Sequence, residues 1–332
     1  MQKSKRQREI LRNKINDNII MKKYLITGGA GFIGSNIVKK LLERGESVRA
    51  VDNLSTGRKE NIKEFIGNPN FEFIEGDLTN LDDAHKAVKG IDFVLHEAAV
   101  PSVPRSIEDP IKSNNSNITG TLNLLIAARD EGVKKLVYAS SSSIYGDNPE
   151  LPKREDFPIR PISPYALTKY AAERYCQIFW KIYKLPTVSL RYFNVFGPKQ
   201  NPKSQYAAVI PNFISAFIKN EKPIIYGSGE QSRDFTYVDN VVEANILAAN
   251  CTEGNGEVFN IACGGETSLN QLVNFLKEIT GKNISADYGE ERAGDVLHSR
   301  ADIEKAQKII KYRPIVNFKE GLAKTFEWYT QN

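Results

Sequence analysis

A glycine-rich segment near the start of the chain constrains the fold more than any other feature. Residues 28–34 read Gly-Gly-Ala-Gly-Phe-Ile-Gly; an apolar run at 24–27 precedes them, and apolar residues recur at helical spacing over 37–42. A tight turn from strand to helix requires residues without a Cβ atom. Free amides and the dipole at the helix start favour a bound pyrophosphate. The segment therefore predicts a strand, a turn and a helix that bind a dinucleotide.

An acidic residue ends the next predicted strand, at 47–51. Asp52 lies where a carboxylate can bind the adenosine ribose hydroxyls, and it would repel a 2′-phosphate. We therefore expect the cofactor to be NAD rather than NADP. The cofactor contacts expected from this unit are Gly28, Gly31, Phe32, Ile33, Gly34, Asp52 and Asn53.

Strands and helices continue to alternate along the first half of the chain. Runs at 71–77, 91–96 and 135–139 predict three more strands, and helical stretches such as 117–131 separate them. This alternation is typical of an α/β fold with a doubly wound parallel sheet of the Rossmann type. In such sheets ligands bind at the carboxyl ends of the strands. Asp77 and the pair Ala98-Ala99 are expected at this edge.

A tyrosine and a lysine four residues apart, Tyr165 and Lys169, should lie on one face of a helix. The pKa of a free tyrosine is about 10, so it is a poor base at neutral pH. A lysine cation and the positive nicotinamide ring would lower that pKa. The bare pair is also common on amphipathic helices. The four serines at 140–143, at the end of the preceding strand, favour a catalytic role, because a serine hydroxyl can share the substrate's proton with the phenol.

Together these features resemble the extended short-chain dehydrogenase/reductase family. The resemblance is carried by the glycine segment, by 77–78, 96–99 and 117–121, by the serines, and by Tyr165 with Lys169. Segments 191–198 and 232–240 are similar to the nucleotide-sugar branch of the family. The resemblance covers nearly everything from Met21 onwards. It implies tightly held NAD, a smaller mixed α/β C-terminal domain for a nucleoside-diphosphate sugar, and a homodimer.

The domain organisation follows from this resemblance. We expect a basic arm at 1–20, a NAD-binding Rossmann domain at 21–191 and a nucleotide-sugar-binding domain at 192–330, with a segment near 236–262 returning to the first domain. Further cofactor contacts are implied for Asp77, Leu78, Ala98, Ala99, Asn117, Tyr165 and Lys169.

The serine run bears on the reaction type. Related 4,6-dehydratases carry an acidic residue in this region, whereas residues 141–143 are all serine here, which favours 4-epimerisation. The chain is most similar to UDP-N-acetylhexosamine 4-epimerases at 206–211 and 292–302. There Ser299 matches a gate position at which a bulky tyrosine would block the 2-N-acetyl group. UDP-glucose could be a further substrate, and UDP-glucuronate epimerases share a similar serine run, so the serines do not decide the sugar.

The resemblance also implies roles for single residues. Tyr165 takes the C4 hydroxyl proton while the C4 hydride passes to NAD+; Ser141 and Ser142 hydrogen-bond the reacting oxygen, and Lys169 lowers the pKa of Tyr165. The 4-keto sugar then turns over and takes the hydride back on its other face. Contacts to the substrate are implied for Ser143, Asn194, Val209, Tyr226, Arg233, Arg292, Asp295 and Ser299.

Other classes compete with this interpretation. A 4-ketosugar reductase, or an enzyme that decarboxylates a UDP-uronate, would share most of these motifs. A reductase would consume external NAD(P)H, whereas an epimerase recycles its own cofactor. A non-catalytic NAD-binding regulator ranks last, because such relatives tend to lose the Tyr/Lys pair.

Composition limits the kinds of partner that we expect for this protein. The net charge is +5, but residues 1–20 hold six basic and two acidic side chains, which leaves about +1 for the body. This balance gives no ground for a nucleic-acid surface on the folded part. No apolar stretch is long enough to span a membrane, so a cytoplasmic protein is expected. The three cysteines lack metal-ligand spacing, and no metal is expected.

Overall fold

A seven-stranded parallel sheet forms the centre of the protein. The computed structural model describes residues 21–201, 208–291 and 297–331, so the expected arm at 1–20 lies outside the described residues. The strand order, β11-β6-β5-β4-β1-β2-β3, is that of a doubly wound sheet, and every neighbouring pair is parallel. The predicted fold class is thereby confirmed. The strands are β1 (Lys23–Thr27), β2 (Ser47–Asp52), β3 (Phe71–Glu75), β4 (Phe93–His96), β5 (Lys135–Ser141), β6 (Thr187–Tyr192) and β11 (Val258–Ile261).

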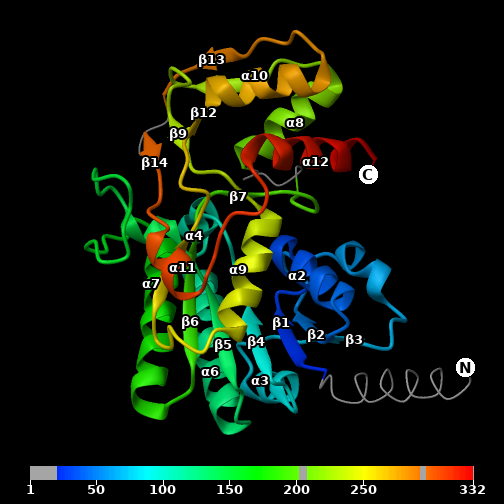
Figure 1. Cartoon of the computed structure of the whole chain (residues 1–332), viewed down its shortest axis with the longest axis vertical. Helices are drawn as coiled ribbons and strands as arrows, with labels where there is room; N and C mark the ends of the chain where they lie inside the picture. The colour runs from blue at the N-terminus through cyan, green and yellow to red at the C-terminus, as the bar shows by residue number, and fades with distance from the viewer. Residues whose placement is uncertain (1–20, 202–207, 292–296, 332) are drawn as a thin grey trace, which may run out of the picture.

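Helices cover both faces of this sheet, which explains why central strands such as β1 and β5 read as apolar runs (Figure 1). In β1, Leu25 packs in the core on one face and Ile26 in the core on the other, as the alternation of side chains along a strand requires. The helices on the Ile26 face are α2 (Phe32–Glu43) and α9 (Val238–Asn250), and those on the Leu25 face are α3 (Leu81–Val88), α6 (Gly120–Asp130) and α7 (Pro164–Ile178).

Short helices lie between β4 and α6. The predicted helix at 117–131 is α6 preceded by a wider π-helical turn, Asn115–Thr119, and before it come α4 (Val103–Glu108) and α5 (Pro110–Asn114). A second π-helical turn, Phe179–Tyr183, extends α7. Single 3-10 turns are Lys59–Asn61, Lys63–Phe65 and Ser142–Tyr145.

A smaller lobe of helices and very short strands lies at one end of the molecule (Figure 1). Its aromatic core includes Phe196, Phe235 and Phe318, whose ring centroids lie 5.3 to 6.3 Å apart. Its helices are α8 (Val209–Lys219), α10 (Leu269–Thr280) and α12 (Phe318–Gln331); its strand groups are β7 (Val195–Phe196) with β10 (Thr236–Tyr237), β8 (Ile224–Tyr226) with β13 (Asp287–Gly289), and β9 (Ser232–Arg233) between β12 (Thr267–Ser268) and β14 (His298–Ser299).

The chain returns to the main sheet after it has built part of the smaller lobe. Helix α9 packs against α2, and β11 pairs with β6 at the edge of the seven-stranded sheet. The helix α11 (Glu304–Ile309) then packs on β11. The residue limits of the two domains stay a prediction, but these contacts agree with a segment near 236–262 that rejoins the first of them.

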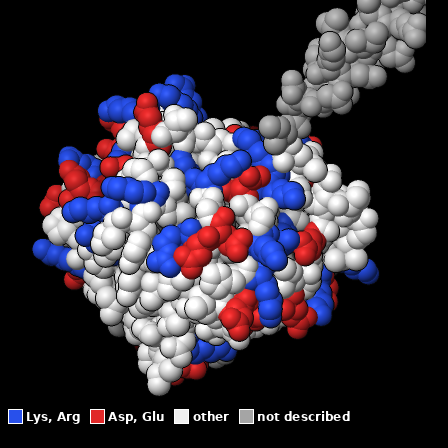
Figure 2. Space-filling model, turned by 90° about the horizontal axis from the view of Figure 1, so that it is seen from below, with Lys and Arg blue, Asp and Glu red and all other residues white. Residues whose placement is uncertain are grey.

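The surface carries charges of both signs. Figure 2 shows lysine and arginine side chains interspersed with aspartate and glutamate over the face in view. Within the described ranges no helix combines the length and the apolar character needed to cross a bilayer.

Candidate active site

A pocket of about 380 Å³ runs along the carboxyl edge of the main sheet. Residues from segments far apart in the sequence line it, as expected for a ligand site in a doubly wound sheet. A second pocket of about 310 Å³ lies in the smaller lobe, and Ala208 lines both. The predicted residues that line the first pocket are Gly28, Gly31, Phe32, Ile33, Gly34, Asp52, Asn53, Asp77, Leu78, Ala98, Ala99, Tyr165 and Lys169.

The glycine turn leaves no room for side chains. Gly28 has a φ of +64°, and a Cβ atom there would lie 2.9 Å from the backbone of Ala98. At Gly34 a Cβ atom would lie 2.2 Å from the carbonyl oxygen of Gly28. Helix α2 starts with Gly31 as its N-cap and has no acidic residue in its first turn, so no side chain competes for its first amides. This backbone cradle at a helix N-terminus fits the pyrophosphate of NAD.

Asp52 is held rigidly at the end of β2. Its carboxylate accepts hydrogen bonds from the amides of Ala30 (3.1 Å) and Leu54 (2.8 Å), and burial raises its pKa. Next to it, Asn53 donates to Asp77 (3.0 Å) and so ties the ends of β2 and β3 together. Hydrogen bonds within the protein thus orient these side chains along the pocket.

Asn117 and His96 support the pocket wall from behind. Asn117 was expected at the cofactor, but it is not among the described lining residues: its amide accepts from Val100 N (2.8 Å) and donates to Thr168 Oγ1 (3.0 Å). His96 is buried between the hydroxyls of Thr27 (2.7 Å) and Thr121 (2.9 Å), and burial lowers its pKa to about 3. His96 is therefore neutral near pH 7, and Asn117 positions the wall and α7.

Helix α7 brings Tyr165 and Lys169 to the pocket. Its N-cap, Ser163, accepts from the Ala166 amide (3.2 Å), and Pro164 occupies the first turn, where its missing N–H costs nothing. Lys169 is buried and donates to the carbonyl oxygen of Ala139 (2.7 Å). Burial lowers the pKa of Lys169 to about 8. The pair thus lies together on α7, one turn apart.

The phenol of Tyr165 is in contact with the serine run. Burial raises the pKa of Tyr165, and its hydrogen bond with the Ser141 side chain acts in the opposite direction. The lysine, which donates to a backbone carbonyl of β5, aligns the helix with that strand. The predicted lowering of the Tyr165 pKa by Lys169 stays a prediction.

The four serines have different surroundings. Ser141 Oγ accepts from the amide (3.2 Å) and the hydroxyl (2.9 Å) of Ser143, which orients it beside Tyr165. Ser142 begins the 3-10 turn that follows β5. Ser140 lines the first pocket and donates to Glu173 Oε2 (2.7 Å), whereas the expected residues Ser141, Ser142 and Ser143 are not among its described lining residues. Of the run, Ser141 is the serine that lies at the phenol.

The second pocket holds three of the expected substrate residues, Asn194, Val209 and Arg233. Ser299 pairs with Arg233 across β14 and β9, and its carbonyl oxygen accepts from Asp234 N (2.7 Å). Tyr226 is outside the described lining and is 38 % exposed. The expected residues Arg292 and Asp295 lie outside the described residues.

Sequence reasoning missed several residues of the first pocket. Glu97 and Tyr192 both line it, and the Tyr192 hydroxyl donates to Glu97 Oε1 (2.7 Å). Burial raises the pKa of Glu97 to about 7. Both belong to segments that carry the family resemblance, so a signal for them existed. The loop at 55–61, a polar stretch directly after Asp52 and Asn53, could also have been assigned.

A segment of the smaller lobe, residues 198–201, forms another missed wall. Lys199 Nζ donates to the carbonyl oxygen of Asn61 (2.7 Å), and Asn36 Nδ2 donates to the carbonyl oxygen of Pro198 (3.1 Å). Gln200 lines the pocket and is held through its carbonyl oxygen by the hydroxyl of Tyr329. Nothing in the local sequence of this segment indicates such a position.

Known proteins share this architecture over nearly the whole chain. The structure is similar to a UDP-N-acetylglucosamine 4-epimerase from Methanobrevibacter ruminantium, in complex with UDP-N-acetylmuramic acid (42 % identity, TM-score 0.89, 94 % of this chain and 99 % of that one). It is also similar to a UDP-glucose 4-epimerase from Thermotoga maritima with UDP-glucose (40 %, TM-score 0.87, 93 % and 99 %). A UDP-glucuronate 4-epimerase from Thermodesulfobacterium geofontis is 39 % identical over 320 residues (93 % and 96 %).

The family itself follows from a match over most of the chain. Residues 24–262 match the model of the NAD dependent epimerase/dehydratase family. The matched range includes the glycine turn, the serine run and the Tyr165–Lys169 pair. The cofactor is accordingly NAD, and the backbone cradle described above fits it. The chain belongs to the NAD dependent epimerase/dehydratase family.

Proposed function

We propose that the protein is a 4-epimerase of UDP-hexoses that interconverts UDP-GlcNAc and UDP-GalNAc and also accepts UDP-glucose and UDP-galactose. The observation that carries this proposal is the position of Tyr165 and Lys169, which lie one turn apart on α7 and both line the cofactor pocket, beside the end of β5 that carries the serine run. This arrangement can remove a proton from a sugar hydroxyl and later return it.

Each residue has a defined part in this reaction. When bound, NAD+ would accept the hydride from C4 and would later supply it to the other face of the same carbon. Tyr165 accepts the C4 hydroxyl proton, and Ser141 hydrogen-bonds the same oxygen with Ser142 as its neighbour. Lys169 fixes α7 against β5 and supplies a positive charge near the phenol. The 4-keto sugar turns in the pocket, and Tyr165 gives the proton back when the other face of C4 is reduced.

The surroundings of the serine run support epimerisation rather than dehydration. Residues 140–145 contain no acidic side chain, and the nearby Glu173 is not among the described lining residues and is paired with Arg191 at 2.8 Å. No carboxyl group of this segment is free to act in the elimination of water. A 4-epimerase of UDP-uronates is the alternative, since a relative with that name matches 93 % of the chain.

The second pocket is the proposed nucleotide end of the substrate. Arg233 and Asn194 line it beside the aromatic rings of Phe196 and Phe235, so it combines phosphate-binding and apolar groups. Ser143 is the proposed sugar contact, and Val209, Tyr226, Arg292 and Asp295 complete the proposed set. The residue shared by both pockets, Ala208, lies where the sugar would pass from one to the other.

We also infer that two copies of the chain form a dimer. Exposed apolar side chains gather on α4, α5 and α7, among them Ile107 (65 % exposed), Ile111 (73 %) and Leu167 (54 %). Large apolar side chains in one area of a soluble protein are typical of an interface. Leu167→Lys should convert the dimer to a monomer in light scattering, whereas the same change at the exposed Ile66, which lies outside these helices, should not. A monomeric unmodified protein would contradict the inference.

The decisive experiment is a substrate comparison without added cofactor. We expect the purified protein to interconvert UDP-GlcNAc and UDP-GalNAc faster than UDP-glucose, and to leave UDP-glucuronate unchanged. Dependence on stoichiometric NADH or NADPH would instead identify a reductase, and turnover of UDP-glucuronate alone would identify the uronate epimerase.

The choice of sugar is tested at Ser299. Ser299→Tyr should lower kcat/KM for the N-acetylated sugars by about 10- to 100-fold and spare UDP-glucose, because an added ring excludes a larger substituent first. Ser299→Ala is the matched control and should change neither. An equal loss on both classes of sugar would contradict the gate.

A further inference from the structure

A buried ion pair lies behind the serine run. Glu173 and Arg191 are 1 % and 4 % exposed, and they are joined by two hydrogen bonds, Arg191 Nη2 to Oε1 (2.8 Å) and Arg191 Nε to Oε2 (3.0 Å). Glu173 follows Tyr165 and Lys169 at the same spacing along α7, while Arg191 is near the end of β6. Neither residue is among the described residues that line the two pockets.

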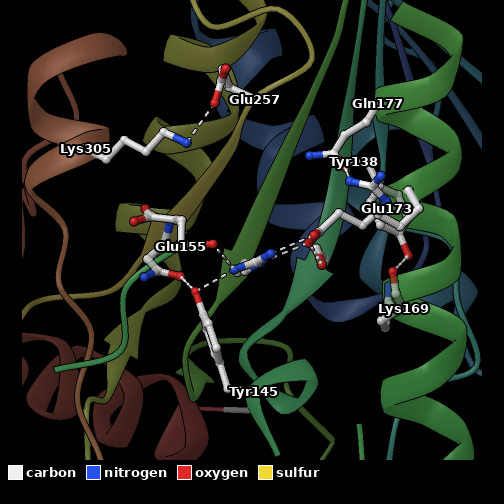
Figure 3. Close-up of polar contacts among 12 residues, drawn as sticks. Tyr138, Tyr145, Glu155, Lys169, Glu173, Gln177, Glu257 and Lys305 are labelled. Carbon is white, nitrogen blue, oxygen red and sulfur yellow. Dashed lines mark hydrogen bonds and ion pairs between the residues drawn. The ribbon is translucent and has the colours of Figure 1, made fainter. Parts of the chain in front are cut away.

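Each member of the pair holds one end of the serine segment. Glu173 Oε2 accepts from Ser140 Oγ (2.7 Å), the residue before Ser141. Arg191 Nη1 donates to the hydroxyl of Tyr145 (2.7 Å), which ends the 3-10 turn after Ser142. Figure 3 shows Glu173 on one side of this network and Tyr145 with Glu155 on the other. The ion pair therefore spans the residues that surround Ser141.

The network also extends to the edge of the main sheet. The Tyr145 hydroxyl donates to Asn260 Oδ1 (2.7 Å) on β11, and the Asn260 amide donates to Glu155 Oε1 (2.7 Å). Arg191 stacks on the Tyr145 ring with 4.9 Å between its Cζ and the ring centroid. Every group of the network is thus satisfied, which makes its geometry specific.

We propose that the Glu173–Arg191 pair is a positioning device that sets Ser141 at the correct distance from the Tyr165 phenol. Three contacts align α7 with the end of β5 in succession: Tyr165 with Ser141, Lys169 with the carbonyl of Ala139, and Glu173 with Ser140. The last contact also joins α7 to β6, through Arg191. The two residues would position Ser141 for the proposed reaction, so this inference rests on the proposed function.

Stability alone is a weak reason for such a pair. Removing two charges from water is costly, and well-packed apolar residues of similar volume often stabilise a protein as much or more. A planar guanidinium that donates two parallel hydrogen bonds to one carboxylate fixes orientation as well as distance. Catalysis that depends on a hydrogen bond between Ser141 and Tyr165 requires this kind of fixed geometry.

The test removes the links and keeps the ion pair. Ser140→Ala and Tyr145→Phe each delete one hydroxyl that joins the pair to the serine segment. We expect each to lower kcat about tenfold, with KM and bound NAD unchanged, because a small displacement of a reacting group is costly. Glu257→Gln is the control: it breaks the exposed ion pair with Lys305 seen in Figure 3 and should change nothing.

A second measurement needs no turnover. The titration of Tyr165 is obtained as the ultraviolet difference between each variant and the same variant with Tyr165→Phe. Because the bond with Ser141 lowers the pKa of Tyr165, Ser140→Ala should move this titration to higher pH, and Glu257→Gln should not. If the unmodified protein does not epimerise UDP-sugars, the proposed function fails while this titration still tests the positioning device. Unchanged kcat and an unchanged titration, with only a lower melting temperature, would overturn the proposal.

Discussion

The two pockets of this protein are built in different ways. The cofactor pocket lies at the ends of parallel strands of four to seven residues, and backbone atoms form part of its wall, as at Gly28 and Gly34. The pocket of the smaller lobe lies among strands of two or three residues, and side chains such as Arg233 and Phe235 form its wall.

This difference has a physical consequence for how each pocket tolerates change. A wall of backbone cannot be altered by one substitution without moving the chain, so it suits a cofactor that never varies. A wall of side chains changes with each substitution, so it suits the selection of a substrate. The three similar proteins named above differ in the sugar and agree in the epimerase reaction.

The largest effect is expected at Tyr165, the proposed catalytic base. Tyr165→Phe should lower kcat by about 10²- to 10⁴-fold, the usual size of a lost general acid–base group, and leave UDP-sugar affinity nearly unchanged. The check is steady-state kinetics together with calorimetric binding of the UDP-sugar. A kcat near that of the unmodified enzyme would remove Tyr165 from its role.

The backbone wall of the cofactor pocket is tested at a glycine, and a glycine of the smaller lobe that is in neither described pocket lining is the control. Gly34→Ala should lower NAD affinity by about two orders of magnitude and destabilise the fold by about 1–3 kcal/mol, because the new Cβ would lie 2.2 Å from the carbonyl oxygen of Gly28. Gly265→Ala in the smaller lobe has no atom within 4 Å and should be silent. The measurements are the NAD content of the purified protein and its thermal unfolding. Equal effects at both sites would break the comparison.

The smaller lobe has one rigid point of its own, Asp234. Its buried carboxylate accepts from the amides of Cys263 (2.9 Å), Gly264 (3.0 Å) and Ala301 (3.2 Å). In Asp234→Asn an amide NH₂ would replace one acceptor oxygen, and we expect a loss of about 1–3 kcal/mol in the free energy of unfolding. Asp287→Asn, in an exposed ion pair, is the control and should cost under about 0.5 kcal/mol. Denaturant unfolding distinguishes the two, and a neutral Asp234→Asn would show that the side chains of this lobe adapt throughout.

The smallest effect concerns pH. Burial lowers the pKa of Lys169 to about 8, and the negative charge of Glu97 acts to raise it. Glu97→Gln removes that charge, so Lys169 should lose its proton at a lower pH. If the reaction requires the ammonium, activity falls as pH rises through the Lys169 pKa, and the alkaline limb of the kcat/KM profile should move to lower pH. The exposed Glu64→Gln should not move it. An unchanged alkaline limb would show that Glu97 does not influence the charge on which catalysis depends.

The cofactor half could be predicted from sequence because its signals are local. A parallel strand covered on both faces reads as a run of apolar residues, and the turn after β1 reads as glycines at fixed spacing. Tyr165 and Lys169 were found in the same way, since four residues along a helix return to one face.

The remaining features depend on partners that are distant in the chain. Strands such as β9 and β14 have two residues each and carry no periodicity. Glu173 and Arg191 read as ordinary charges on a helix and a strand, and only the fold reveals that they are buried against each other. Asn117 was expected at the cofactor for its family position, whereas its amide is satisfied by Val100 and Thr168.

The segment at 198–201 has a consequence for how the enzyme is made on the ribosome. A nascent chain that has emerged only as far as β6 holds the glycine turn, Asp52 and Tyr165, but it lacks the wall that Lys199 and Gln200 add over the cofactor. The strand β11 and the Tyr329 hydroxyl that holds Gln200 are translated later still. The complete cofactor pocket therefore forms only near the end of synthesis. For the same reason, we expect a fragment cut after residue 191 to bind NAD more weakly than the whole chain, because it lacks this part of the wall.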